Sequence, residues 1–308
     1  MISVIMLTYN REALVSRAVE SILAQTYRDF EFIIVDNGST DRSGAIADEY
    51  AARDRRIRVI HRERGSIGAG RNTGLDAARG DYIAFIDDDD YCEPDYLNYL
   101  YDLAKQLNAD IAVCGSWREI GGAREPKYVF DGIYTYDGET SVVEMLKREK
   151  FNSANPTKLF STQLFDDLRY CETGKYDDIG FMYRAFAQAR RVVLSGRPCY
   201  TFMRHTDNNS LGTVQGEDPP SPEQISEYLY AFAKRTRWLT QRFPLTADYW
   251  HYTELSYMLS MYDKTDDEGM RKRLMALLRY NKVAFLASKR YYTSRDRQLI
   301  KKYKGELI

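Results

Sequence analysis

Four consecutive aspartates, Asp87, Asp88, Asp89 and Asp90, form the densest acidic cluster in this sequence of 308 residues. Carboxylates packed side by side repel one another, and a hard divalent cation with oxygen ligands relieves that repulsion. The alternative is that an aspartate caps a following helix, for which the sequence from Pro94 offers a first turn. Because a cap needs only one carboxylate, the whole run predicts a divalent cation site.

The aspartates follow an apolar run, and two other polar clusters do the same. The apolar runs at residues 2–7, 32–35 and 82–86 are typical of short buried strands. The side chains that follow the first two runs are Thr8, Tyr9 and Asn10, and then Asp36 and Asn37. Each of these strands is therefore predicted to end in side chains that can bind a polar ligand.

Helical segments separate the strands. Apolar residues recur at helical spacing within residues 11–27, and Asn10 is a candidate cap for that helix. We also expect a glycine-rich turn at residues 65–74, a helix at 94–107 and a strand at 111–114. Strands that alternate with helices predict an α/β fold, with a mostly parallel sheet flanked by helices. In such sheets ligands bind beyond the carboxyl ends of the strands, so the three polar clusters are expected to converge.

The pattern loosens after residue 115. Residues 124–136 suit a loop or an antiparallel ribbon, and a helix is expected at 139–150. Within residues 158–203 we expect a short helical run, an amphipathic helix that contains Phe181 and a strand at 191–194. Pro219 and Pro220 indicate a linker. Ser221 and Thr265 begin capping-box patterns, which predict a C-terminal helical region. We therefore divide the chain into residues 1–115, 116–218 and 219–308.

Composition excludes several classes of protein. The 44 basic and 45 acidic side chains give a net charge of -1, which argues against a general nucleic-acid binder. No signal-peptide pattern precedes the first strand, and no apolar stretch is long enough to span a bilayer. The four cysteines are widely spaced and are expected to be reduced thiols. These features predict a cytoplasmic protein.

Four motifs together resemble those of an inverting family 2 glycosyltransferase with the GT-A fold. In chain order they are residues 3–10 (SVIMLTYN), 32–41 (FIIVDNGSTD), 70–75 (GRNTGL) and 84–90 (AFIDDDD). The resemblance is close over roughly the first 115 residues and weaker to about residue 212. It implies that residues 1–115 bind a nucleotide sugar and that residues 116–218 bind the acceptor and carry the catalytic base.

The resemblance assigns the nucleotide site. It implies that Asp36 hydrogen-bonds a uracil ring, and that Thr8 and Tyr9 line the base pocket with Asn10 beside them. Family members commonly have a second acidic residue where this chain has Asn37. Arg71 resembles a basic residue that reaches the nucleotide, and a guanidinium suits phosphate oxygens for independent reasons.

The same resemblance assigns the metal site. It implies that Asp87 contacts the ribose or the metal, that Asp88 lies at the nucleotide, and that Asp89 is the main metal ligand. Mg²⁺ and Mn²⁺ both fit, and the ion would neutralise charge on the leaving nucleoside diphosphate.

The implied catalytic base is Asp178, because Asp177 and Asp178 occupy the place of the family's Glu-Asp pair. The shorter Asp177 departs from that pattern, and the alternative is that this pair only caps the next helix. Arg204, His205 and Ser210 lie where family members carry a loop that folds over the diphosphate. A polar loop with a solvated Arg and His is equally compatible with the sequence.

The implied reaction moves a sugar from a nucleotide sugar, with UDP as the expected nucleotide, to a glycan or lipid-linked acceptor in surface polysaccharide synthesis. One alternative is a sugar nucleotidyltransferase, which should carry a glycine-rich and basic loop after the first strand. The sequence there is Thr8, Tyr9 and Asn10. The other alternative is a non-catalytic module that binds nucleotide sugars.

The C-terminal residues 289–304 are rich in basic and aromatic side chains, among them Lys289, Arg290, Tyr291 and Tyr292. Such a segment suits peripheral contact with an anionic lipid surface, at the inner face of the membrane if the acceptor is lipid-linked. A solvated helix face or a contact within a homo-oligomer explains it equally well.

Overall fold

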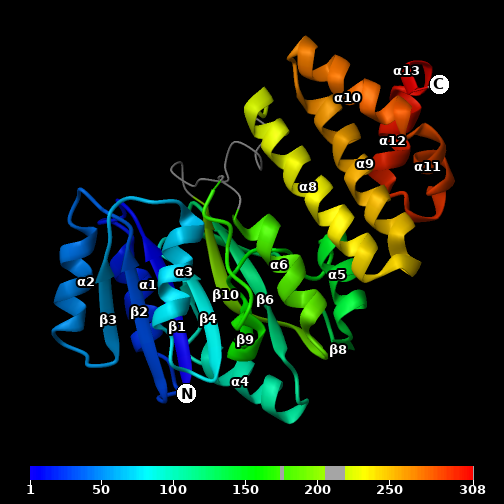
Figure 1. Ribbon diagram of the computed structural model, residues 1–308. Helices are drawn as coiled ribbons and strands as arrows, with labels where there is room; N and C mark the ends of the chain where they lie inside the picture. Colours follow the sequence, from blue (N-terminus) through cyan, green and yellow to red (C-terminus); the bar gives the residue numbers. More distant parts are fainter. Residues whose placement is uncertain (174–176, 205–218, 308) are drawn as a thin grey trace. The chain divides into compact units, whose positions relative to one another are not determined.

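The computed structural model describes residues 1–173, 177–204 and 219–307 (Figure 1). The chain divides into two compact units, Met1–His205 and Thr206–Ile308. The first unit contains the sheet, and the described part of the second is helical. The division predicted between residues 115 and 116 falls inside a strand, β6 (Ile111–Ile120).

Ten strands of the first unit form one sheet in its described residues, in the order β3-β2-β1-β4-β9-β6-β10-β5, with β7 beside β6 and β8 beside β10 (Figure 1). The other strands are β1 (Ile2–Thr8), β2 (Phe30–Asp36), β3 (Ile57–His61), β4 (Tyr82–Asp87), β5 (Tyr91–Cys92), β7 (Ala123–Pro126), β8 (Ile133–Tyr136), β9 (Lys158–Ser161) and β10 (Val192–Arg204). The predicted α/β fold class is confirmed.

Parallel pairing joins β1 to β2 and β4, β2 to β3, and β6 to β10. Strand β9 interrupts this pattern, because it lies antiparallel between β4 and β6. The short helical run predicted within residues 158–203 is present as the 3-10 helix at Thr162–Phe165, but the strand β9 before it was not predicted. Leu159 and Phe160 are both fully buried, so a strand of four residues shows no alternation that would distinguish it from a helix. Residues 124–136 do contribute antiparallel strands, β7 and β8.

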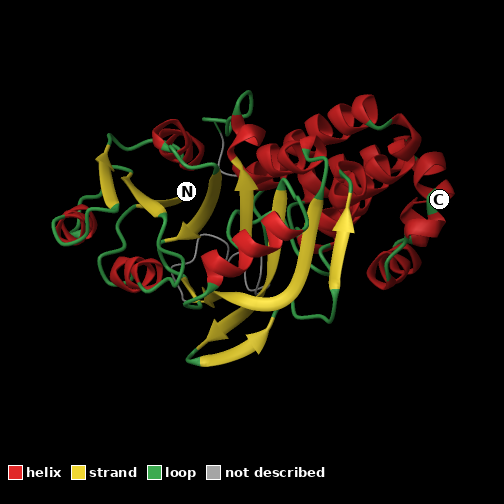
Figure 2. Cartoon of the chain, turned by 90° about the horizontal axis from the view of Figure 1, so that it is seen from below, coloured by secondary structure: helices red, strands yellow, loops and turns green. Residues whose placement is uncertain are grey.

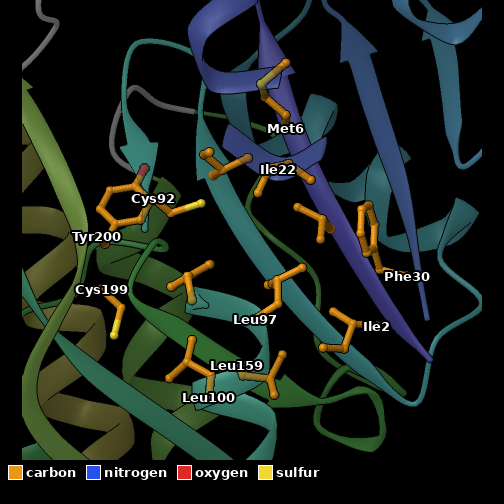
Figure 3. Packing of buried hydrophobic residues seen from close by; sticks show 14 of the residues in the cluster. Ile2, Met6, Ile22, Phe30, Cys92, Leu97, Leu100, Leu159, Cys199 and Tyr200 are labelled. Atoms are coloured by element: carbon orange, nitrogen blue, oxygen red, sulfur yellow. The ribbon is translucent and has the colours of Figure 1, made fainter. Parts of the chain in front are cut away.

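Two helices, α1 (Val15–Leu23) and α4 (Tyr96–Gln106), pack on one face of the sheet. Ile22 of α1 and Leu97 and Leu100 of α4 are fully buried in one cluster with strand residues such as Ile2 and Met6 (Figure 3). Burial of each such side chain contributes roughly 1.5–3 kcal/mol. The side chains of β1 alternate between this face and the opposite face of the sheet.

The helix α3 (Ile67–Ala77) packs against the opposite face of β1, and Figure 2 shows helices on both sides of the strands. Its bounds correct the prediction of a turn at residues 65–74, since Gly68, Gly70 and Gly74 lie inside the helix. A Cβ atom at Gly70 would lie 2.3 Å from Leu7 Cδ1, and one at Gly74 would lie 2.4 Å from Ile5 Cγ2. The glycines serve close contact between helix and strand rather than a turn.

Aromatic side chains fill the layer between the sheet and α6 (Asp177–Gln188). Phe85 of β4 meets Tyr170 edge to face at 6.1 Å between ring centroids, and Tyr170 stacks on Phe181 of α6 at 3.6 Å. Phe160 of β9 meets Phe186 of α6 in the same layer. These contacts fix the start of α6 relative to β4. The remaining helices of this unit are α2 (Ser43–Ala51), α5 (Gly138–Lys147) and the 3-10 helix η1 (Thr162–Phe165).

The described part of the second unit consists of α8 (Pro222–Arg242), α9 (Ala247–Lys264), α10 (Glu268–Tyr280), α11 (Lys282–Ala287), α12 (Ser294–Lys302), α13 (Lys304–Leu307) and the short turns η2 (Pro244–Thr246) and η3 (Lys289–Tyr291). The predicted capping box at Ser221 is confirmed, with Gln224 as its partner. The predicted start at Thr265 was wrong by two residues, because Asp267 caps α10 by accepting a hydrogen bond from the Met270 amide.

Much of the basic and aromatic C-terminal segment is engaged within the second unit. Tyr291 and Tyr292 pack against Tyr252, and Tyr303 is buried. Arg290 forms an ion pair with Asp248. Among the residues that the structure describes, no helix combines the length and apolar character needed to cross a bilayer. The membrane contact stays a prediction.

Candidate functional site

The strand ends bring the predicted site residues of β1, β2 and β4 to one edge of the sheet. Thr8 lies opposite Asp36 in the parallel pair β1–β2, and Leu7 lies opposite Asp87 in the pair β1–β4. The backbone carbonyl of Thr8 accepts a hydrogen bond from the amide of Asn37. Residues far apart in the sequence thus lie next to one another at the carboxyl ends of three strands.

Two hydrogen bonds hold the Asp36 carboxylate. Its Oδ1 accepts from the Ser39 amide at 2.9 Å, and its Oδ2 lies 3.0 Å from His61 Nδ1. The other ring nitrogen of His61 lies 3.1 Å from Asp48 Oδ1, and both contacts raise the pKa of His61. Burial raises the pKa of Asp36, but the hydrogen bonds from Ser39 and His61 outweigh it, so this pKa lies below its ordinary value. Asp36 is therefore a charged acceptor near neutral pH.

Tyr9 and Asn10 continue from the end of β1. The guanidinium carbon of Arg64 lies 3.1 Å from the centroid of the Tyr9 ring. Asn10 has a φ of 52° and accepts a hydrogen bond from the Thr40 amide at 2.8 Å. It does not cap the next helix, which begins at Val15, so that prediction was wrong. Its side chain instead joins the end of β1 to the loop after β2.

Asn37 stands where members of the resembled family commonly have a second acidic residue. Its side-chain amide donates to the Gly65 carbonyl at 2.9 Å, and its Oδ1 accepts from the Gly65 amide at 3.3 Å. Asn37 is 3% exposed. An ionised carboxylate could accept but not donate here, so the amide of Asn37 suits both bonds and fixes the loop before α3, whose N-terminus is capped by Ser66.

The four aspartates have different surroundings. Asp90 is buried, accepting hydrogen bonds of 2.8 Å from the Tyr200 hydroxyl and from the Met203 amide. Burial and the neighbouring Asp89 and Asp87 raise the pKa of Asp90 well above its usual value. This carboxyl group faces protein and joins the aspartate run to β10.

Asp88 also faces the protein. Its Oδ2 accepts from the Tyr9 amide at 3.4 Å, and its Oδ1 lies 3.8 Å from Arg11 Nε. Burial and Asp89 raise the pKa of Asp88 to about 7. The carboxylate predicted to lie at the nucleotide therefore contacts the backbone that leads from β1.

Asp87 and Asp89 alternate with these two residues. Asp87 Oδ1 accepts from the guanidinium of Arg71 at 3.4 Å, so the predicted nucleotide-binding Arg71 projects from α3 to the aspartate run. The side chain of Asp87 is 39% exposed. The Asp89 carbonyl accepts from Arg17 at 2.6 Å.

A cation at this run would have two carboxylates, those of Asp87 and Asp89. Within residues 1–173, 177–204 and 219–307, no three His, Cys, Asp or Glu side chains gather as a metal-binding cluster. Mg²⁺ in nucleotide sites commonly takes one or two protein carboxylates, with substrate phosphates and water as the other ligands. The donor set fits an ion that arrives with a diphosphate.

Asp178 is the second residue of α6, and it is half-buried. Its Oδ2 accepts a hydrogen bond of 3.1 Å from the Ser153 hydroxyl. Asp177 begins the same helix. The stacking of Tyr170 on Phe181 packs this helix against the sheet, as described above. An oriented carboxylate at a helix N-terminus can accept a proton, and it can equally stabilise the helix.

Arg204 is the last residue of β10. Burial, and after it the charge of Arg204, lowers the pKa of Lys127 to about 8, so the two cations lie near each other. His205 and Ser210 lie outside the described residues.

Comparison with known proteins finds a family match over the part of the chain that contains β1, β2 and β4. The model of "Glycosyl transferase family 2" matches residues 3–169, which is more than half of the chain. The chain belongs to glycosyl transferase family 2. Family membership argues against the alternative of a sugar nucleotidyltransferase.

Relatives in the family include the uncharacterized glycosyltransferase EpsJ of Bacillus subtilis, which is 34% identical over 70% of this chain and 63% of EpsJ. The glycosyltransferase GlyG of Streptococcus pneumoniae is 31% identical over 67% of this chain and 71% of GlyG. The chain therefore spans less than two thirds of EpsJ. The crystal structure of S. aureus TarS 1-349 in complex with UDP-GlcNAc has a TM-score of 0.62 and 18% identity, covering 99% of this chain and 91% of that one. The predicted GT-A fold is confirmed by this likeness.

Sequence reasoning missed three residues of this family 2 site. His61 ends β3 directly opposite Asp36, and its place after an apolar run was a usable signal. Tyr200 contacts Asp90 from a strand more than a hundred residues later. Ser153 reaches Asp178 from a loop without regular structure, and no local pattern in the sequence indicates that contact.

Proposed function

We propose that this family 2 enzyme transfers a sugar from a UDP-sugar to an acceptor hydroxyl, with metal dependence and inversion at the anomeric carbon. The observation that carries the proposal is the meeting of Thr8, Asp36 and Asp87 at adjacent strand ends. In an α/β sheet this edge is where nucleotides bind.

Asp36 is the proposed contact for the nucleotide base. Its lowered pKa keeps it ionised, and a carboxylate is a strong acceptor for the imide N–H of uracil. Ser39 and His61 hold the carboxylate in place, which reduces the entropy lost on binding. The resemblance to TarS, whose structure was determined with UDP-GlcNAc, supports a UDP-sugar as donor.

Asp87 and Asp89 are the proposed ligands of Mg²⁺ or Mn²⁺, as the resemblance of the aspartate run to the family's metal motif implies, while Asp88 and Asp90 contact the backbone after β1 and β10. When bound, the ion would offset the negative charge that develops on the leaving diphosphate. Arg71 contacts Asp87, and its guanidinium suits the same phosphate oxygens. Tyr200 and Arg17 hold the backbone of the run.

Asp178 is the proposed general base. Its carboxylate takes the proton of the acceptor hydroxyl as that oxygen attacks the anomeric carbon. The bond from this carbon to the diphosphate oxygen breaks, and the nucleoside diphosphate leaves with the bonding electrons. Attack opposite the leaving group converts an α-linked donor into a β-linked product.

A glycan or lipid-linked surface polymer is the proposed acceptor. The poly(ribitol-phosphate) beta-glucosyltransferase of Bacillus spizizenii is 29% identical over 69% of this chain and 34% of that protein. Its name describes a polymeric acceptor. The name also describes transfer in the β configuration. Forming a β-linkage from an α-linked UDP-sugar requires inversion, so this likeness supports the proposed stereochemistry.

The test is calorimetric binding of a panel of nucleotide sugars with Mn²⁺, with Mg²⁺ and with chelator, followed by an assay of nucleotide release. A UDP-sugar should bind with metal and release UDP, and early NMR spectra of the released sugar should show the β-anomer. Failure of every nucleotide sugar to bind under any metal condition would contradict the proposal.

A further inference from the structure

Lys158, the first residue of β9, is a fully buried lysine that the proposed mechanism does not use. Its Nζ donates to the carbonyls of Ala154 at 2.6 Å and of Pro156 at 3.2 Å, and to the Thr157 hydroxyl at 3.3 Å. A lysine ammonium has three N–H donors, so these acceptors satisfy all of them. Such a group is rarely buried without a reason, because removing its charge from water is costly.

All three acceptors belong to one loop, residues 151–157, and that loop also carries Ser153, which donates to Asp178. The loop turns sharply, since Thr157 has a φ of 72°. The loop is held at Phe151, which stacks on Phe186 at 5.3 Å, and at Asn155, which accepts a hydrogen bond from Tyr170. The Lys158 ammonium holds the carbonyls on either side of Asn155, those of Ala154 and Pro156.

The charged groups around Lys158 also involve the proposed base. The pKa of Lys158 is lowered to about 7, chiefly by burial and also by Lys127, while Cys114 and Asp178 act in the opposite direction. Burial raises the pKa of the Cys114 thiol well above its usual value, so the thiol is neutral. Of the groups that shift the pKa of Lys158, the one that carries a carboxylate is Asp178, and its negative charge favours the charged form of Lys158.

We propose that Lys158 is a positioning residue, which holds loop 151–157 so that Ser153 orients the Asp178 carboxylate, and whose charge favours the ionised base. The inference rests on the proposed function, in which Asp178 is the base. The effect is reciprocal, because a charge that Asp178 stabilises on Lys158 also stabilises the negative charge of Asp178.

Substitution of Lys158 or of Ser153 should raise the pKa of the proposed base, Asp178. Lys158→Met keeps the apolar length of the side chain but removes the charge and the three donors. Ser153→Ala removes one hydrogen bond to the ionised carboxylate. Each change favours protonated Asp178, so the acid limb of the pH profile should move to higher pH. If Lys158 served folding alone, its substitution would lower stability and leave the acid limb of the pH profile unchanged.

The experiment measures UDP release from UDP-glucose and UDP-N-acetylglucosamine with Mn²⁺ between pH 5 and pH 9 by the whole chain, at the order of ten pH points. Wild type is compared with Lys158→Met, Ser153→Ala and Asp178→Asn, and the Kd for UDP is measured for each. We expect Lys158→Met to lower kcat about tenfold or more and to move the acid limb up by about half a pH unit or more. Ser153→Ala should shift the limb in the same direction by less, and the Kd for UDP should stay within about twofold.

The outcomes separate the two proposals. Unchanged kcat and an unchanged acid limb in Ser153→Ala and Lys158→Met, with Asp178→Asn inactive, would overturn this inference alone. If Lys158→Met does not fold, an unchanged profile in Ser153→Ala still overturns it, because the loop acts through that hydroxyl. Wild-type UDP release by Asp178→Asn would overturn the assignment of the base and this inference with it.

Discussion

The hydroxyl of Tyr200 donates a hydrogen bond of 2.8 Å to the carboxyl group of Asp90, the last residue of the aspartate run. The same hydroxyl accepts a hydrogen bond of 3.2 Å from the Asp87 amide. Tyr200 lies on β10 and is fully buried beside Cys199 and Tyr96. One side chain thus connects the two ends of the run to a strand that begins more than a hundred residues later.

Replacing Tyr200 with Phe should destabilise the first unit, because the change leaves a buried carboxyl oxygen and a backbone amide without their partner. We expect a loss of about 1–3 kcal/mol in the free energy of unfolding, measured by urea denaturation. Tyr280→Phe is the matched control, since Tyr280 is 89% exposed and should tolerate the change. Equal stability of the two variants would show that this hydrogen bond carries no net energy.

The contact between His61 and Asp36 should make stability depend on pH. The folded pKa of His61 is raised, so its contribution is complete below the unfolded value of about 6.5 and is lost as the pH rises through the folded value. The folded pKa of Asp36 is lowered, so its contribution is present above about pH 4 and is lost as the pH falls through the folded value. The stability difference between wild type and His61→Ala should therefore be largest between about pH 4 and 6.5. A difference that is constant from pH 3 to pH 9 would contradict this.

The glycines of α3 should resist substitution. Gly70→Ala places a methyl group 2.3 Å from Leu7 Cδ1, so the Leu7 side chain, α3 or β1 must shift, at a cost of about 1–3 kcal/mol. Gly305→Ala is the control, because a Cβ added there would meet no described atom within 4 Å apart from its own and neighbouring residues and the backbone of its own helix. Thermal unfolding should show a lower Tm for Gly70→Ala and an unchanged or slightly higher Tm for Gly305→Ala. The reverse order would mean that α3 does not lie this close to β1.

Asp89 is expected to matter for donor binding through the metal. Asp89→Ala should weaken UDP binding in Mn²⁺ by at least about tenfold, and binding in chelator should stay as in wild type. The exposed Asp167, changed to Ala, controls for the loss of one negative charge. Calorimetric titration with UDP measures both. Equal loss of affinity in Mn²⁺ and in chelator would assign Asp89 a direct contact with the nucleotide.

The half of the site at the strand ends could be predicted from the sequence. Thr8, Asp36 and Asp87 each follow an apolar run, and the rules for parallel sheets bring such ends together. The placement of Arg71 could not be predicted correctly, because the glycines before and after it indicate a turn. Their real role depends on Ile5 and Leu7 on another strand.

The other half depends on contacts that leave no local pattern. β9 is too short to show a periodic pattern, and in the sequence a lysine at its first position argues against a buried strand, although Lys158 is in fact buried. The hydrogen bond from Ser153 to Asp178 joins an irregular loop to a helix 25 residues later. Motif order indicated the position of the proposed base, but the hydrogen bond from Ser153 to this residue is visible only in the packed structure.

Asp178→Asn offers the most direct test of the central claim, that this family 2 enzyme transfers a sugar with Asp178 as its base. The measurement compares the Kd for a UDP-sugar in Mn²⁺ with the rate of UDP release, for wild type and Asp178→Asn. The two proteins should bind the donor within about twofold of each other, and the variant should release UDP at least about a hundredfold more slowly. Release at the wild-type rate by a variant that binds the donor normally would contradict the account.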